Sequence, residues 1–181
     1  MLNERRVEII LGSMFSGKST ELLRRLSRYD AIHTPTLLIN SSLDTRTGKS
    51  VKTHQNIVKD ATKTNNLMDI IDTPEYRKCL VIGIDEAQFF PDLVKFVRYS
   101  ERDKTIIIAG LDGDSERRPF GQILNCIPLC DDVIKLTAMD MMSNDGTPGI
   151  FSKRISNETR DQILVGHENK YISVSRKNYF T

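Results

Sequence analysis

Cysteine is scarce in this 181-residue chain, and no disulfide framework can be built from it. Cys79, Cys126 and Cys130 are too few and too scattered, and none belongs to a C-x-x-C pair. A reducing compartment is therefore the simplest expectation. The chain also lacks a signal-peptide-like opening and any apolar run long enough to span a bilayer, so we expect a soluble, cytoplasmic protein.

An excess of charge of one sign is absent as well. The 26 basic and 24 acidic side chains leave a net charge of +2. This near-balance provides no electrostatic case for a nucleic-acid or membrane partner. The length suits one domain, or one domain with a small appendage, and is sufficient to bury a hydrophobic core.

Short, continuous apolar runs are the clearest local pattern. They lack helical periodicity and are rich in β-branched residues, as expected of strands that are buried on both faces of a parallel sheet. Helical spacing of Leu22, Leu23, Leu26 and Tyr29 predicts a helix after the first run. The sequence predicts an α/β fold with a parallel sheet flanked by helices, with strands at 7–11, 36–39, 79–85, 104–110 and 133–136 and further helices at 67–71 and 92–99.

The last forty residues differ in composition. Residues 139–149 are rich in Asn, Asp, Gly and Pro, which predicts a loop or a disordered excursion. Short apolar runs at 163–165 and 171–174 predict two small strands. We expect a main domain over residues 1–136 and a small C-terminal lobe over residues 137–181.

A glycine-rich motif lies between the first predicted strand and helix. Residues 12–19 fit the G-x4-G-K-[ST] pattern, in which backbone N–H groups and a helix N-terminus surround phosphate oxygens. Lys18 would contact the outer phosphates, and the Ser19 hydroxyl would bind Mg²⁺. The sequence predicts a site for a nucleoside triphosphate formed by Gly12, Ser13, Met14, Phe15, Ser16, Gly17, Lys18 and Ser19.

Two carboxylates end the apolar run at 79–85. Asp85 is the candidate acid for Mg²⁺, and Glu86 is placed to orient or deprotonate an attacking oxygen. The alternative is that both acids merely end a strand in solvent. These motifs do not distinguish an ATPase, which uses water as the acceptor, from a kinase, which uses a substrate hydroxyl.

Several segments together resemble the cellular and poxvirus type of thymidine kinase. They occur in family order over nearly the whole chain, namely at 12–22, 44–46, 53–54, 82–90, 109–113, 118–120, 127–129, 135–138 and 151–154. The resemblance implies a RecA-like phosphate-loop fold with a small lobe and a lasso-like loop. It also implies transfer of the γ-phosphate of ATP to the 5′-hydroxyl of thymidine, for DNA synthesis by salvage, and a homotetramer.

The resemblance also implies roles for individual positions. Glu86 would be the general base, and Arg46 would stabilise charge on the transferring phosphate together with Lys18. The donor site would include Asp44, Thr45, Arg46, Asp85, Glu86, Ala87 and Gln88. The nucleoside would be contacted at Met14, Ser115, Phe120, Gln162, Ile163, Leu164, Val165, Gly166 and Tyr171.

The chain departs from the family at three places. Two C-x-x-C pairs that usually hold Zn²⁺ are replaced by Asp140 with Ser143 and by Ser175 with Asn178. One carboxylate without thiolates or imidazoles is not a zinc site, so we predict no zinc and expect packing alone to hold the lobe, with a more mobile segment around residues 139–149. Ser115 stands where a base-packing phenylalanine is usual, and His167 where a second glycine is usual.

These departures leave three functional interpretations open. The first is a thymidine kinase, with altered nucleoside choice at Ser115 and His167 as its variant. The second is a non-catalytic nucleotide-binding paralogue, against which the retention of Glu86 and Arg46 argues. The third is an ATPase coupled to nucleic acid, against which the near-neutral charge argues.

Overall fold

A six-stranded, wholly parallel sheet forms the centre of the protein in the computed structural model, which describes residues 4–44, 50–52, 58–155 and 170–181. The strand order is β5-β2-β6-β7-β1-β8. The strands are β1 (Val7–Gly12), β2 (Thr36–Ser41), β5 (Thr62–Thr64), β6 (Val81–Asp85), β7 (Thr105–Gly110) and β8 (Asp132–Leu136).

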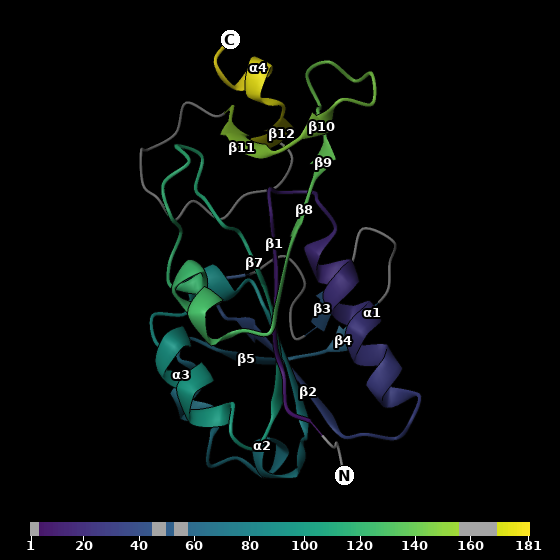
Figure 1. Cartoon of the computed structure of the whole chain (residues 1–181), viewed down its shortest axis with the longest axis vertical. Helices are drawn as coiled ribbons and strands as arrows, with labels where there is room; N and C mark the ends of the chain where they lie inside the picture. The colour runs from purple at the N-terminus through teal and green to yellow at the C-terminus, as the bar shows by residue number, and fades with distance from the viewer. Residues whose placement is uncertain (1–3, 45–49, 53–57, 156–169) are drawn as a thin grey trace.

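Helices cover both faces of this sheet. The helix α1 (Lys18–Asp30) lies on one side, and α2 (Pro74–Lys78) and α3 (Leu93–Ser100) lie on the other (Figure 1). The second face also receives the 3-10 helices η1 (Leu67–Ile70) and η3 (Ile123–Leu129). A third 3-10 turn, η2 (Ala87–Phe89), follows β6 directly.

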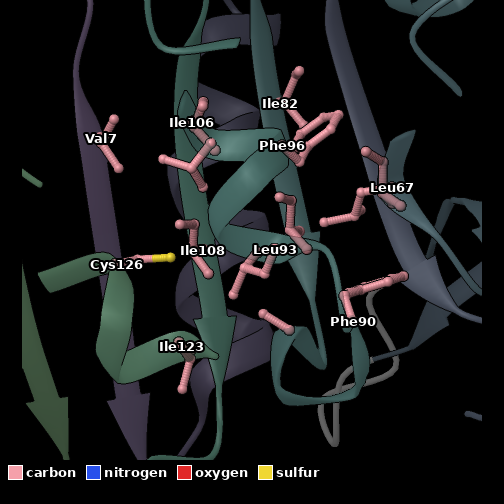
Figure 2. Close-up of a cluster of buried hydrophobic side chains, with 14 of the residues drawn as sticks. Val7, Leu67, Ile82, Phe90, Leu93, Phe96, Ile106, Ile108, Ile123 and Cys126 are labelled. Carbon is pink, nitrogen blue, oxygen red and sulfur yellow. The ribbon is translucent and has the colours of Figure 1, made fainter. Parts of the chain in front are cut away.

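Alternate residues of each central strand enter two separate hydrophobic clusters. In β7, Ile106 and Ile108 face α3 and η3, whereas Ile107 faces α1. Figure 2 shows the first cluster, in which side chains of the strands meet Phe96 of α3 and Cys126 of η3. Because both sets are buried, the strands carry continuous apolar runs and do not alternate with polar residues.

Small antiparallel pairs lie outside the main sheet. The pair of β9 (Ala138–Met139) with β10 (Pro148–Gly149) and that of β11 (Phe151–Arg154) with β12 (Tyr171–Val174) lie beyond its carboxyl end, together with α4 (Arg176–Tyr179) (Figure 1). The strands β3 (Ser50–Lys52) and β4 (Val58–Asp60) form a separate two-stranded antiparallel sheet. No helix in the described part of the chain is long and apolar enough to cross a membrane.

The five predicted strands of the sheet, the α/β class and the helix after the phosphate loop are confirmed. The predicted helix at 92–99 is α3, but the one at 67–71 is the 3-10 helix η1. Neither β5, whose three residues are polar, nor η3, which contains Pro128, was predicted. The prediction of a loop over residues 139–149 is wrong at both ends, because these residues pair as β9 and β10.

Candidate active site at the carboxyl end of the sheet

The phosphate loop makes a tight turn directly after β1. Gly12 has a φ of 153°, and a Cβ there would lie 2.6 Å from the Leu136 carbonyl oxygen, so the position requires glycine. Gly17 and Phe15 both have left-handed backbones, with φ of 84° and 63°. The loop therefore follows a path that ordinary residues rarely adopt, which is typical of backbone that approaches a ligand closely.

The loop leads into the N-terminus of α1, where Gly17 is the cap residue and no side chain caps the helix. The first N–H groups of such a helix have no partner within the helix and attract anions. Lys18 is buried, and its Nζ donates to the Ser13 carbonyl oxygen at 2.7 Å. The ammonium group is thus held over the loop, and its contact with the outer phosphates stays a prediction.

The acidic end of β6 meets the start of α1. The Ser19 hydroxyl donates to Asp85 Oδ1 at 3.1 Å, although the two residues lie 66 positions apart. Asp85 Oδ1 also accepts the Glu86 N–H at 3.0 Å. The hydroxyl and the carboxylate predicted to hold Mg²⁺ are therefore adjacent, and hard oxygen ligands of this kind suit that ion.

Glu86 follows in a left-handed conformation, with φ of 51° and ψ of 42°. Its Oε2 accepts a 2.6 Å hydrogen bond from Gln88 Nε2, while Gln88 Oε1 accepts the Leu111 N–H at 3.0 Å. Gln88 thus connects the carboxylate to the end of β7. Gln88 was predicted as part of the nucleotide site, but its contact with Glu86 was not predicted.

Two glycines leave the room that Gln88 occupies. A Cβ at Gly110 would lie 2.6 Å from Gln88 Oε1, and a Cβ at Gly121, where φ is 62°, would collide with the Gln88 carbonyl oxygen. Gln88 itself is buried. The orientation of the Glu86 carboxylate is therefore set by a side chain with little freedom of its own.

The end of β2 contributes a third polar group beside β6. Asn40, which is paired in register with Asp85, donates through Nδ2 to Asp44 Oδ2 at 3.0 Å. Lys63 donates to the Asp44 carbonyl oxygen at 2.7 Å. Sequence analysis predicted Asp44 but missed Asn40, whose polar side chain at the end of an apolar run was the available signal. The other predicted members of this loop, Thr45 and Arg46, lie outside the described residues.

The predicted nucleoside contacts are only partly described. Phe120 is buried and packs edge-on against Phe89, with ring centroids 5.6 Å apart. Tyr171 is buried in β12, and its hydroxyl accepts from Arg154 at 3.1 Å. The Ser115 carbonyl oxygen accepts from the Tyr179 hydroxyl at 2.8 Å. Residues 162–166, as well as His54 and His167, lie outside the described residues.

The C-terminal strands reach back to the phosphate loop. The Ser13 hydroxyl donates to the Gly149 carbonyl oxygen at 3.1 Å and lies 3.2 Å from Ser173 Oγ. The Met14 N–H donates to Ser152 Oγ at 3.0 Å. The resemblance included Ser152 in the segment 151–154 but gave it no role, and it did not include Ser173; both lie more than 130 positions from the loop.

Parallel strands that end at one edge, with a phosphate loop before α1 and an acid after β6, define an α/β protein of the phosphate-loop type. The family model described as thymidine kinase matches residues 5–179. The thymidine kinase of Yaba monkey tumor virus (strain VR587) is 47% identical over 175 residues, covering 96% of this chain and 94% of the viral protein. That of raccoon poxvirus is 44% identical over 179 residues, 98% of each chain.

The thymidine kinase of myxoma virus (strain Uriarra) is 43% identical over 176 residues, covering 97% of this chain and 96% of the viral protein. Both the family match and these relatives extend over nearly the whole length. The chain belongs to the thymidine kinase family.

Proposed function

We propose that this protein transfers the γ-phosphate of ATP to the 5′-hydroxyl of thymidine. The observation that carries the proposal is the hydrogen bond of Ser19, at the start of α1, to Asp85, which directly precedes Glu86. This contact supports a cation site and a base at one edge of the sheet. The family match and the named viral relatives support thymidine as the acceptor.

The donor would bind along residues 12–19, with its phosphates facing the first N–H groups of α1 and the ammonium of Lys18. Ser19 and Asp85 would hold Mg²⁺, which neutralises charge on the phosphates when bound. Asp44 would complete the donor side, where Asn40 and Lys63 fix its position. Arg46, Thr45 and Ala87 remain proposed members of this site.

Glu86 would accept the proton of the 5′-hydroxyl as the phosphate is transferred. Its Oε2 is oriented by Gln88, so the carboxylate need not reorganise during the step. Positioned bases usually contribute about 10²- to 10⁴-fold to the rate. Met14, Phe120, Tyr171 and residues 162–166 remain proposed nucleoside contacts, and Ser115 and His167 are where nucleoside choice would depart from that of the family.

A panel of deoxynucleosides offered with ATP and Mg²⁺ tests this function. Product formed with thymidine supports the proposal, whereas ADP released without any nucleoside would indicate an ATPase. ATP binding without turnover on any nucleoside would indicate a silent paralogue.

The Glu86→Gln variant tests the base, because it keeps the size of the side chain and removes the proton acceptor. We expect ATP binding to be retained and kcat to fall by about 10²- to 10⁴-fold. Transfer near the unsubstituted rate would remove Glu86 from this role.

We also propose a homotetramer, a cytoplasmic location and a division into residues 1–136 and 137–181. Light scattering of the purified protein tests the first, and fluorescence imaging of the tagged protein tests the second. Limited proteolysis tests the third.

A further inference from the structure

The four residues at the positions of the family's zinc cysteines lie together in the structure. Asp140 and Ser143 come from the β9–β10 turn, and Ser175 and Asn178 come from the end of β12 and from α4. The first pair of residues is separated from the second pair by more than 30 positions along the chain. The resemblance would imply Zn²⁺ at this place.

Hydrogen bonds converge on the buried carboxylate of Asp140. Its Oδ1 accepts the N–H groups of Met142 at 2.8 Å and Ser143 at 3.1 Å. Its Oδ2 accepts the Ser175 N–H at 2.7 Å and Asn178 Nδ2 at 2.9 Å. Burial by itself would raise the pKa of Asp140, but hydrogen bonds from Ser175, Met142 and Ser143 outweigh it and hold the pKa below its usual range. The carboxylate is therefore an ionised acceptor with four donors.

This donor set does not fit a metal ion. Zinc sites are built from four lone-pair donors directed at one point, usually thiolates or imidazoles. Here N–H groups point inward, and Asn178 Nδ2 also donates to Ser143 Oγ at 3.2 Å. Among the described residues, no group of three or more His, Cys, Asp or Glu side chains could hold a metal. The earlier expectation that packing alone holds the lobe is wrong, because these hydrogen bonds cross-link it.

The cross-linked segment also holds the phosphate loop. The Met141 N–H, next to Asp140, donates to the Ser173 carbonyl oxygen at 2.9 Å, and the side chain of Ser173 lies against that of Ser13. A Cβ at Gly149 would collide with Ser173 Oγ. Ser13, Gly149 and Ser173 are therefore in close contact. The Ser13 carbonyl oxygen in turn accepts Lys18 Nζ. A continuous series of contacts joins Asp140 to Lys18.

We infer that Asp140, Ser143, Ser175 and Asn178 form a metal-independent clasp that holds Ser173 against the phosphate loop, which makes Asp140 a positioning residue for donor binding. This inference rests on the proposed function only in that the loop binds ATP. It adds a structural role for the lobe and replaces the metal that the resemblance implies.

Asp140→Asn tests the clasp. One of the two oxygens becomes an NH₂ group, so two of the four donors lose their acceptor. We expect the melting temperature to fall by about 4–10 °C, given roughly 2–4 °C per kcal/mol for a chain of this size. The dissociation constant of a non-hydrolysable ATP analogue with Mg²⁺ should rise at least about fivefold. Asp145→Asn is the matched control, because Asp145 is exposed on the same turn and accepts the Thr147 N–H at 3.0 Å within that turn.

Two further variants separate positioning from stability. Ser173→Ala removes the contact with Ser13 and should weaken analogue binding with little change in melting temperature. In combination with Asp140→Asn, it should add little further loss of binding, because both act on one chain of contacts. If Asp140→Asn does not fold, then Asn178→Ala, which removes two hydrogen bonds of the half-buried Asn178 side chain, should show the same pattern to a smaller degree.

Metal analysis of the purified protein completes the test. We expect no stoichiometric zinc and no change in melting temperature on addition of a chelator. One zinc ion per chain whose removal lowers the melting temperature would overturn the metal-independent clasp. A lower melting temperature in Asp140→Asn with unchanged analogue binding would overturn the positioning role. Analogue binding needs no turnover, so these outcomes are separate from a failure to phosphorylate thymidine.

Discussion

The left-handed backbone of Glu86 shows how single residues are constrained at this site. Such a conformation costs a non-glycine residue about 1–3 kcal/mol and persists only where the surroundings determine it. Here the Asp85 carboxylate holds the Glu86 N–H and Gln88 holds its side chain. The constraint directs the carboxylate toward the Gln88 side chain. The proposed base is thus held in place from two directions.

Gln88 should support catalysis through its hydrogen bond to Glu86. Gln88→Met keeps the length of the side chain but removes the hydrogen bond to Glu86. A hydrogen bond to a charged group contributes about 1.5–3 kcal/mol, so we expect kcat to fall by about ten- to hundredfold with a smaller change in the KM for ATP.

The same substitution in a Glu86→Gln background should cost little more, because no base remains to be oriented. Gln122→Met is the control, since Gln122 holds the Val94 N–H at the start of α3 and donates to the Pro91 carbonyl oxygen. Equal losses of kcat from Gln88→Met in both backgrounds would show that Gln88 acts only on the fold.

At the scale of elements, the packing of α1 on β6 positions Ser19 against Asp85. Gly83 lies opposite the buried side chains of Leu22 and Leu26, and a Cβ there would lie 2.6 Å from one methyl carbon of Leu26. The absence of a side chain at Gly83 lets the helix approach the strand closely. The distance between the two halves of the proposed cation site therefore depends on a residue outside that site.

We predict that Gly83→Ala lowers the free energy of unfolding by about 1–3 kcal/mol, the usual cost of overpacking a core. Denaturant titration measures the change. Gly113→Ala is the control, because a Cβ at Gly113 meets its nearest atom at an ordinary 3.5 Å. Equal stability of the two variants would contradict the close approach of α1 and β6.

One side of α1 carries a partly buried ion-pair group whose effect depends on pH. Glu21 accepts from Arg24 at 2.6 Å and from Arg25 at 2.8 Å, and Arg25 also pairs with Glu8 of β1. The hydrogen bond from Arg24 lowers the pKa of Glu21 to about 2, against the opposing effect of burial. Because the pKa of Glu21 is lower in the folded protein than its ordinary value of 4.5, the ionised carboxylate stabilises the fold above pH 4.5. This stabilisation is lost as the pH falls toward 2.

We therefore expect Glu21→Gln to melt at a lower temperature than the unsubstituted protein at pH 7. The loss in the free energy of unfolding should be about 0.3–1 kcal/mol, which is typical of partly exposed ion pairs. This loss should shrink as the pH is lowered from 4.5 toward 2. Thermal melts at pH 7, 5, 4 and 3 measure it. Glu4→Gln is the control at an exposed acid. A loss that stays constant with pH would contradict the lowered pKa.

At the scale of the whole molecule, the C-terminus is joined to the loop that follows β7. The Tyr179 hydroxyl reaches the Ser115 carbonyl oxygen, and the Arg117 guanidinium lies 4.4 Å from the centre of the Tyr179 ring. The Phe151 ring packs edge-on against Tyr179 at 5.3 Å. The segment that contains Ser115 is therefore held through the Ser115 carbonyl group and through the Arg117 side chain. Ser115 is the position where the family usually has a base-packing phenylalanine.

This connection supports a prediction for Tyr179→Phe, which keeps the ring and removes the hydroxyl. One hydrogen bond of about 0.5–1.5 kcal/mol would be lost, so we expect the KM for thymidine to rise about two- to tenfold while the KM for ATP stays nearly unchanged. Tyr99→Phe, at an exposed tyrosine, is the control. An equal rise in both KM values would show a general loss of structure.

Local patterns in the sequence determined the parallel sheet, the phosphate loop and the acids Asp85 and Glu86, because buried strands and phosphate-binding turns each need particular residues within a short stretch. The resemblance extended this to the family, and the comparisons confirm it. Short polar strands such as β5 and the 3-10 helix η3 carried no comparable signal.

Only the tertiary structure decided how distant parts meet. The contact of Gln88 with Glu86 depends on the room left by Gly110 and Gly121, which no local pattern encodes. The contact between the Ser173 and Ser13 hydroxyls and the hydrogen bonds around Asp140 join residues more than 30 positions apart. Such contacts depend on the relative placement of whole elements, which long-range packing determines and local propensity does not.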